Sequence, residues 1–205
     1  MKSPFIHSSH QDHPSFSGKS DLEVWRKFKE GDNGAFVFIY RTYVNDLFQI
    51  GIQISGDEAL IKDCIQDFFV DLRERIFHLS DTDNIRLYLI KSFRRRAIKY
   101  IKKKSRFVGQ DQIKESFFVE LAADENMINA QFDQEQLLKL NSALAKMKKK
   151  DREIIYYYFY ENFSYSEIAE VLDYDHVASA RRSIYKALSR LRHIIMVLLI
   201  VCIAR

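Results

Sequence analysis

The chain has 205 residues and a formal net charge of +4, and its 47% of hydrophobic and 14% of aromatic side chains can fill the cores of one large or two small domains. Its 6 glycines and 2 prolines exclude an all-β fold, because sheets need Gly and Pro turns about every 8–12 residues. The 2 cysteines, Cys64 and Cys202, form neither a disulfide framework nor a zinc motif, which favours the reducing cytoplasm. The sequence therefore predicts an all-α, cytoplasmic protein.

Charge is concentrated in three consecutive blocks. Residues 84–110 hold ten Lys or Arg and no acid, residues 111–135 hold seven acids against one lysine, and residues 136–205 hold twelve bases against seven acids. Such a distribution says more about binding partners than the net charge does. It predicts two surfaces that bind a polyanion, separated by an acidic segment.

Residues 1–20 mix Ser, His, Pro and Gly without hydrophobic periodicity, and they lack the apolar stretch of a signal peptide. They are predicted to form a disordered tail. Apolar residues then recur at helical spacing, interrupted by turn residues at 31–34, 51–57 and 80–84. This pattern predicts a bundle of about four helices over 21–107.

The helix predicted near 58–75 has an apolar stripe on one face and a polar stripe on another. The polar stripe consists of Asp63, Gln66, Asp67 and Asp71. Three carboxylates on one face are compatible with a divalent metal or with acid–base catalysis, but no His or Glu elsewhere completes such a site. The chain also lacks a P-loop, a nucleophile elbow and an HExxH motif. We therefore expect a protein-docking surface or plain solvent exposure here, and no catalysis, metal or cofactor.

The helix predicted over the first basic block carries a continuous basic stripe. Its members are Lys91, Arg95, Lys99, Lys102 and Arg106. The aromatic residues interleaved with them are Tyr88, Phe93, Tyr100 and Phe107. Because Lys and Arg bind phosphates and aromatic rings stack on unpaired bases, the block predicts a nucleic-acid-binding face. Phe93 shares the apolar stripe and is expected to be buried.

Residues 108–134 are acid-rich and without a sustained apolar stripe, so they are predicted to form an acidic linker. Residues 135–205 are predicted to form a second helical domain, in which Ser164 and Glu167 make a capping box at the start of a short helix. A tight turn leads into a long helix whose first turns hold Ser179, Arg181, Arg182 and Lys186. This is the order of a helix-turn-helix motif, whose second helix reads the major groove of DNA. The alternative is a helical hairpin with a solvated basic face.

An apolar run of eleven residues, Ile194–Ala204, lies close to the C-terminus. It is shorter than the ~20 residues that span a bilayer. We expect it to pack on its own domain without inserting into a membrane, and a contact with a membrane or a partner is the alternative.

Four segments resemble, in the correct order, motifs of bacterial sigma factors of the extracytoplasmic-function group of the sigma-70 family. The two in the first half are Gly31–Phe36, followed by Tyr40 and Tyr43, and Asp63–Phe69. The two that follow are Tyr88-Leu89 with Arg94–Ala97, and Asp151–Glu153 with Tyr165–Ala169. The chain departs from the family pattern where Arg95 replaces an asparagine, Met147-Lys148 replaces Leu-Pro, and Asn162 replaces a glycine.

The resemblance implies a transcription initiation factor with one helical domain at 21–107 and a helix-turn-helix domain at 135–205. Core RNA polymerase would bind to Asp63, Gln66 and Asp67. The opened minus-ten strand would bind to Lys91, Arg95, Lys99 and Lys102, and the minus-35 element would be read by Ser179, Arg181, Arg182 and Lys186. The acidic linker would pass near the polymerase active-site channel. An anti-sigma protein, often membrane-anchored in this family, would regulate the factor, and no small-molecule substrate is implied.

Two other functions stay open from the residues alone. A dimeric helix-turn-helix regulator that senses a ligand would need an enclosed apolar pocket within 21–107 and would bind palindromic DNA without polymerase. A metal-dependent nuclease would use the carboxylates at 63, 67 and 71 and cleave DNA in the presence of Mg²⁺.

Overall fold

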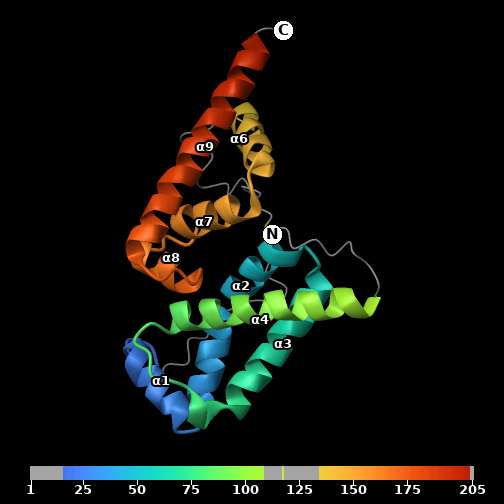
Figure 1. The fold of residues 1–205 in the computed structure, drawn as a ribbon. Helices are drawn as coiled ribbons and strands as arrows, with labels where there is room; N and C mark the ends of the chain where they lie inside the picture. The colour runs from blue at the N-terminus through green and yellow to red at the C-terminus, as the bar shows by residue number, and fades with distance from the viewer. Residues whose placement is uncertain (1–15, 109–116, 118–133, 204–205) are drawn as a thin grey trace. The chain divides into compact units, whose positions relative to one another are not determined.

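The structure is a computed structural model that describes residues 16–108, 117 and 134–203 (Figure 1). Within these ranges the chain forms eight α-helices and one short 3₁₀ helix, and no strand. It divides into an N-terminal unit, residues 1–115, and a C-terminal unit, residues 116–205. The predicted all-α fold with two helical domains is confirmed.

Two of the predicted irregular segments lie largely outside the described residues. One is the disordered tail over 1–20, of which residues 1–15 are not described. The other is the acidic linker over 108–134, of which only its first and last residues and Phe117 are described. The part of the predicted tail that is described is ordered, because Phe16 is buried against Phe38 at a ring-centroid distance of 5.8 Å.

The N-terminal unit is a bundle of four helices whose ends are fixed by short polar side chains. The helices are α1 (Asp21–Lys29), α2 (Asn33–Ser55), α3 (Glu58–Glu74) and α4 (Ile85–Val108). Ser20, Asp32 and Asp57 accept hydrogen bonds from backbone amides at the first turns of α1, α2 and α3. Gly56 ends α2 with φ 73°, a left-handed conformation that favours glycine.

The helix α4 runs across α2 and α3 and closes the core of this unit (Figure 1). Trp25, Phe28 and Phe93 are fully buried within this core. The loop that precedes α4 is tied to α1 by two hydrogen bonds, one from Trp25 Nε1 to the Ser80 carbonyl at 2.9 Å and one from the Ile85 amide to Asp21 Oδ2 at 2.7 Å. These contacts fix the start of α4, and therefore the direction in which its basic side chains point.

The C-terminal unit packs three helices along one long helix (Figure 1). They are α6 (Gln134–Lys146), α7 (Lys149–Phe159) and α8 (Tyr165–Val171), and the long helix is α9 (Val177–Ile203). Aromatic rings fill much of its core, where Tyr157 stacks on Phe163 at 5.6 Å between ring centroids. In the described part of the chain, no helix has the length and apolar character needed to cross a membrane.

Candidate nucleic-acid and polymerase interfaces

The docking face predicted on α3 is exposed to solvent. Asp63, Gln66 and Asp67 all lie on the surface, with Gln66 and Asp67 one turn after Asp63. Val70 extends the same face by a further turn with 57% of its surface exposed. The sequence did not identify Val70 as a surface residue, because an apolar residue next to the apolar stripe of a helix is expected to be buried with that stripe. The face therefore joins acidic, amide and apolar groups, as a protein-docking surface does.

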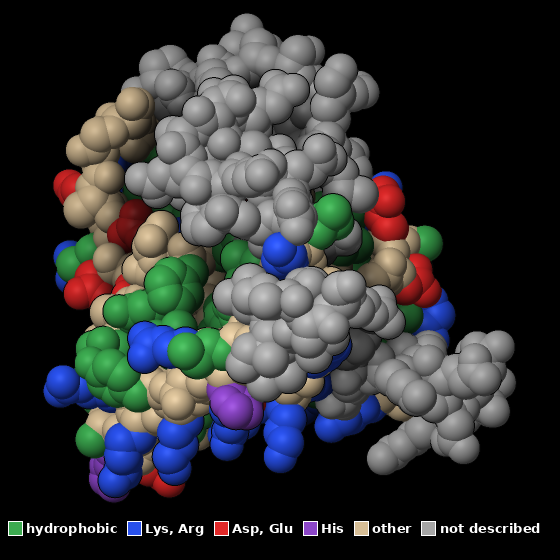
Figure 2. Space-filling view, turned by 90° about the horizontal axis from the view of Figure 1, so that it is seen from above, with side chains coloured by type: hydrophobic (Ala, Val, Ile, Leu, Met, Phe, Trp, Pro, Cys, Tyr) green, Lys and Arg blue, Asp and Glu red, His purple; other side chains and the backbone are tan. Residues whose placement is uncertain are grey.

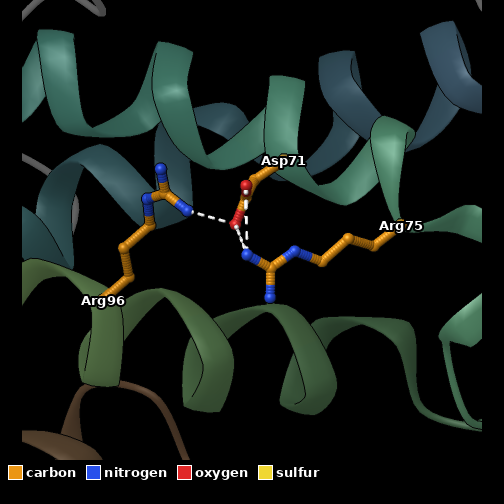
Figure 3. A network of polar contacts seen from close by, with 3 residues as sticks. All are labelled: Asp71, Arg75 and Arg96. Carbon is orange, nitrogen blue, oxygen red and sulfur yellow. Dashed lines mark hydrogen bonds and ion pairs between the residues drawn. The ribbon is translucent and has the colours of Figure 1, made fainter.

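Asp71 does not belong to that open face, which corrects the grouping of three carboxylates made from spacing alone. Its carboxylate lies 2.5 Å from Arg96 Nη1 and 3.3 Å from Arg75 Nη2 (Figure 3). Arg96 comes from α4, which the sequence could not place against α3. Among the described residues there is no group of three or more His, Cys, Asp or Glu side chains able to hold a metal ion.

The predicted minus-ten residues lie on one helix but differ in exposure. Arg95, Lys99 and Lys102 are exposed, whereas Lys91 is half-buried. Phe93 is buried, as expected, with no exposed surface. The ring of Tyr88 packs on Trp25 at a centroid distance of 4.8 Å, and partial burial raises the pKa of its hydroxyl. Of the aromatic residues proposed for stacking, Tyr88 and Tyr100 are both half-exposed. The side chains of Phe107 and Arg106 lie outside the described residues.

A surface hollow of about 490 Å³ lies between α3 and α4. The Asp71 carboxylate is at its wall, and the cations that line it are Arg75, Arg95, Arg96, Lys99 and Lys103. Aromatic rings from Phe68, Tyr88 and Tyr100 line it as well. A hollow with cations and ring faces suits a nucleotide, whose phosphate and base need these two kinds of contact.

Phe77 is the most exposed large apolar residue in the described part of the N-terminal unit. It lies in the 3₁₀ helix Ile76–His78, between α3 and α4, with 83% of its surface exposed. Its neighbours in the chain include Arg75, which lines the hollow. An exposed aromatic ring can stack on an unpaired base. Sequence reasoning missed it because a single aromatic residue in a loop has no periodicity to test.

The helix-turn-helix geometry is present in the C-terminal unit. The Ser164 amide donates to Glu167 Oε2 at 2.8 Å and the Glu167 amide donates to Ser164 Oγ at 3.3 Å, so the predicted capping box is confirmed. Asp173 adopts φ 55°, and the Tyr174 amide donates back to the Ala169 carbonyl at 2.8 Å, which ends α8 and turns the chain. The long helix α9 then begins at Val177.

The two arginines near the start of α9 have different surroundings. The Arg181 guanidinium lies 5.9 Å from the ring centroid of Tyr165 and 5.7 Å from that of Tyr185. Hydrogen bonds lower the pKa of Tyr185, the larger effect coming from Tyr165 and the smaller from Arg181. Arg182 is exposed, and its Nη2 donates to Ser179 Oγ at 3.3 Å. Arg181, Arg182 and Lys186 are all exposed, and the two arginines differ in their contacts, because Arg181 lies against the two rings and Arg182 bonds to Ser179.

The Asp-Arg-Glu segment that resembles a family motif has a structural role. Asp151 is only 6% exposed, and both of its carboxylate oxygens accept from Arg190 Nη1, at 2.7 and 2.8 Å. This ion pair ties the first turn of α7 to the middle of α9. Figure 2 shows Lys and Arg side chains gathered along one edge of the face in view, where Asp and Glu side chains are sparse.

One comparison concerns the C-terminal unit. The sequence of residues 137–191, from α6 into α9, matches the family model described as sigma-70, region 4. This part of the chain is similar to region 4 of sigma-70 factors. The match includes the capping box, the turn and the arginines described above, so the resemblance stated from the sequence is confirmed where the helix-turn-helix was predicted.

The fold of the chain is similar to that of two solved structures. One is CnrH in complex with the cytosolic domain of CnrY, at 19% identity and a TM-score of 0.58, covering 87% of this chain and 99% of CnrH. The other is the sigma factor RpoE in complex with the anti-sigma factor NepR from Bartonella quintana, at 18% identity and a TM-score of 0.54, covering 84% of this chain and 98% of RpoE. No curated protein matches the sequence significantly.

Proposed function

We propose that this chain is a sigma factor that binds core RNA polymerase through α3, holds the opened minus-ten strand on α4, and reads the minus-35 element with the start of α9. The observation that carries the proposal is the exposed basic start of α9 inside a matched region 4 domain. As a promoter-directing factor it would act in the cytoplasm and would itself catalyse no reaction.

The N-terminal unit supports the same function by two separate surfaces. Asp63, Gln66 and Asp67 form an exposed polar face on α3, and the exposed basic residues Arg95 and Lys99 of α4 line the hollow. A factor that must hold both polymerase and a nucleic-acid strand needs two such surfaces of different charge.

The two rival functions are less compatible with the geometry. The nuclease would need Asp71 as a metal ligand, but its carboxylate is already held by Arg96 and Arg75. The ligand-sensing regulator would need an enclosed apolar pocket, whereas the hollow between α3 and α4 is open and lined by cations.

We also propose a regulatory partner of the anti-sigma kind. RpoE is seen in complex with the anti-sigma factor NepR, and its fold is similar to that of this chain. Such a partner would cover the polymerase-binding and DNA-binding surfaces, so that binding of the partner and of core polymerase would exclude each other.

Transcription in vitro with purified core polymerase tests the main proposal. Genomic DNA fragments as template should yield discrete transcripts only when the sigma factor is added. The two rivals predict other results: a nuclease would cut the template when Mg²⁺ is present, and a ligand-sensing repressor would bind DNA without starting transcripts.

Reversing charge on the docking face should lower the affinity for core polymerase. We expect the double variant Asp63→Arg with Gln66→Ala to lose most binding in a pull-down, because two adjacent exposed contacts are removed. The free energy of unfolding should change by about 0.5 kcal/mol or less, since both side chains are exposed. Glu58→Arg is the matched control, because this exposed residue lies about 140° around the same helix. Equal binding by the double variant and the control would contradict the assignment of this face.

Removing the charge of Asp71 should strengthen binding of single-stranded DNA. In Asp71→Asn, Arg75 and Arg96 are no longer neutralised by the carboxylate between them, so each can contact a phosphate. For each new phosphate contact, the slope of log affinity against log salt should steepen by about 0.7. Titration of a labelled oligonucleotide at several salt concentrations measures both effects. Glu58→Gln makes the same charge change elsewhere on α3, and an equal gain in that variant would show that the hollow is not involved.

A further inference from the structure

One residue of the predicted acidic linker is firmly attached to the C-terminal unit. Phe117 has no exposed surface, and its ring lies 5.4 Å from the ring centroid of Tyr156 and 6.2 Å from that of Tyr157. Both tyrosines belong to α7 and are themselves buried. A fully buried aromatic side chain is a large contribution to attachment, and it is unusual inside a segment that composition alone assigns to a linker.

The backbone at Phe117 is held as well as the ring. Arg152 Nε donates to the Phe117 carbonyl at 2.6 Å. The same guanidinium donates through Nη1 to the carbonyls of Ala145 and Met147, at 3.2 and 2.6 Å. Arg152 therefore clamps the linker to the junction of α6 and α7 with charge-assisted hydrogen bonds. Ring and backbone together form an anchor, which we define as Phe117, Arg152, Tyr156 and Tyr157.

The anchor divides the linker into two segments that differ in kind. Residues 118–133 start at the anchor and lead to α6, so both of their ends are fixed on the C-terminal unit. Residues 109–116 alone connect the anchor to the end of α4 in the N-terminal unit. The covalent tether between the two units therefore has eight residues, although the predicted linker covers 108–134.

This difference limits how far apart the two units can move. A chain of eight residues reaches at most about 30 Å, whereas all of 109–133 would reach about 85 Å. Neighbouring base pairs lie about 3.4 Å apart along the duplex. If one unit holds the minus-ten strand and the other reads the minus-35 element, the tether restricts the DNA length between them.

We propose that Phe117, held by Arg152, Tyr156 and Tyr157, is a positioning residue that restricts the spacer length between the two promoter elements that this sigma factor accepts. The inference rests on the function proposed above. Phe117 touches neither DNA nor polymerase in this role, because it acts by shortening the chain that joins the two reading surfaces.

A pair of insertions tests the proposal without disturbing the anchor. Six Gly and Ser residues are inserted at one of two places. The tether-side insertion follows Gln112, within residues 109–116, and the closed-side insertion follows Glu125, within residues 118–133, whose two ends are both fixed on the C-terminal unit. Transcription with core polymerase is measured on promoters that differ only in spacer length. The tether-side insertion adds about 20 Å of reach, so promoters up to about six base pairs longer should become active. The closed-side insertion, equal in length and composition, should leave the spacer profile of the natural chain unchanged.

Phe117→Ala should broaden the profile in the same direction as the tether-side insertion. Thermal unfolding of this variant shows whether the C-terminal unit stays folded, and the insertion pair keeps the test valid if it does not. Equal broadening by both insertions, or no broadening by either, would overturn the proposal.

A measurement without polymerase separates this inference from the proposed function. Small-angle X-ray scattering on the full chain should give a larger radius of gyration for the tether-side insertion than for the closed-side insertion. Equal radii would overturn the anchor even if promoter-directed transcription is observed. Unequal radii with no promoter-directed transcription by the natural chain would contradict the proposed function while supporting the anchor.

Discussion

Replacing Arg190 by alanine is expected to destabilise the C-terminal unit by about 2 kcal/mol. Breaking a buried ion pair costs about 3–5 kcal/mol because the remaining charge stays buried, and the half-exposed position of Arg190 reduces that figure. The side chain of Asp151 is 9% exposed, and it would lose the guanidinium that donates hydrogen bonds to both of its oxygens. The middle of α9 would lose its ion pair with α7.

The chain contains an internal reference for this measurement. Its single tryptophan, Trp25, lies in the core of the N-terminal unit. Denaturation followed by circular dichroism should show an earlier transition in Arg190→Ala, while Trp25 fluorescence should report an unchanged N-terminal unit. Arg192→Ala is the matched control, because this exposed residue lies two positions further on and should change stability by about 0.5 kcal/mol or less. Adding Asp151→Asn to Arg190→Ala should restore part of the loss, since the uncompensated carboxylate is removed. A double variant less stable than Arg190→Ala would contradict this account.

Helices and their boundaries could be predicted because local signals agree with the packing. In α3, the apolar stripe that contains Ile61 and Ile65 became the buried face, and Asp57 caps its first turn. In α8, the capping box of Ser164 and Glu167 was readable in the sequence for the same reason. Both signals depend on residues three or four positions apart, which any helix brings together.

The parts that escaped prediction depend on contacts between elements. Asp71 has the spacing of an exposed carboxylate, and only the packing of α4 against α3 brings Arg96 to it. Phe117 lies in an acid-rich stretch, and only the fold of the C-terminal unit provides Arg152 and the two tyrosines that bury it. Neither spacing nor composition carries information about such partners, so Asp71 was assigned from its spacing and Phe117 from the composition of its segment.

The choice between Arg181 and Arg182 is another case in which the sequence left two possibilities that geometry separates. Adjacent residues lie about 100° apart on a helix, so we expect one of the pair to read bases and the other to contact phosphate. Both are exposed, but Arg181 lies against the rings of Tyr165 and Tyr185. Arg182 donates a hydrogen bond to Ser179. We therefore propose that Arg182 reads bases and Arg181 contacts phosphate.

Arg182→Ala should consequently relax the preference for one base pair of the minus-35 element, at a cost of roughly 1–3 kcal/mol for the preferred sequence. Arg181→Ala should instead weaken binding to all sequences alike and reduce the salt slope by about one unit, because one phosphate contact is lost. Titrating both variants against a panel of minus-35 point mutants at two salt concentrations measures each effect separately. Tyr185→Phe removes the hydroxyl that contacts Arg181 and should show a weaker form of the Arg181→Ala result. The reverse pattern, with relaxed preference in Arg181→Ala and uniform weakening in Arg182→Ala, would show that the tyrosines aim Arg181 at the bases.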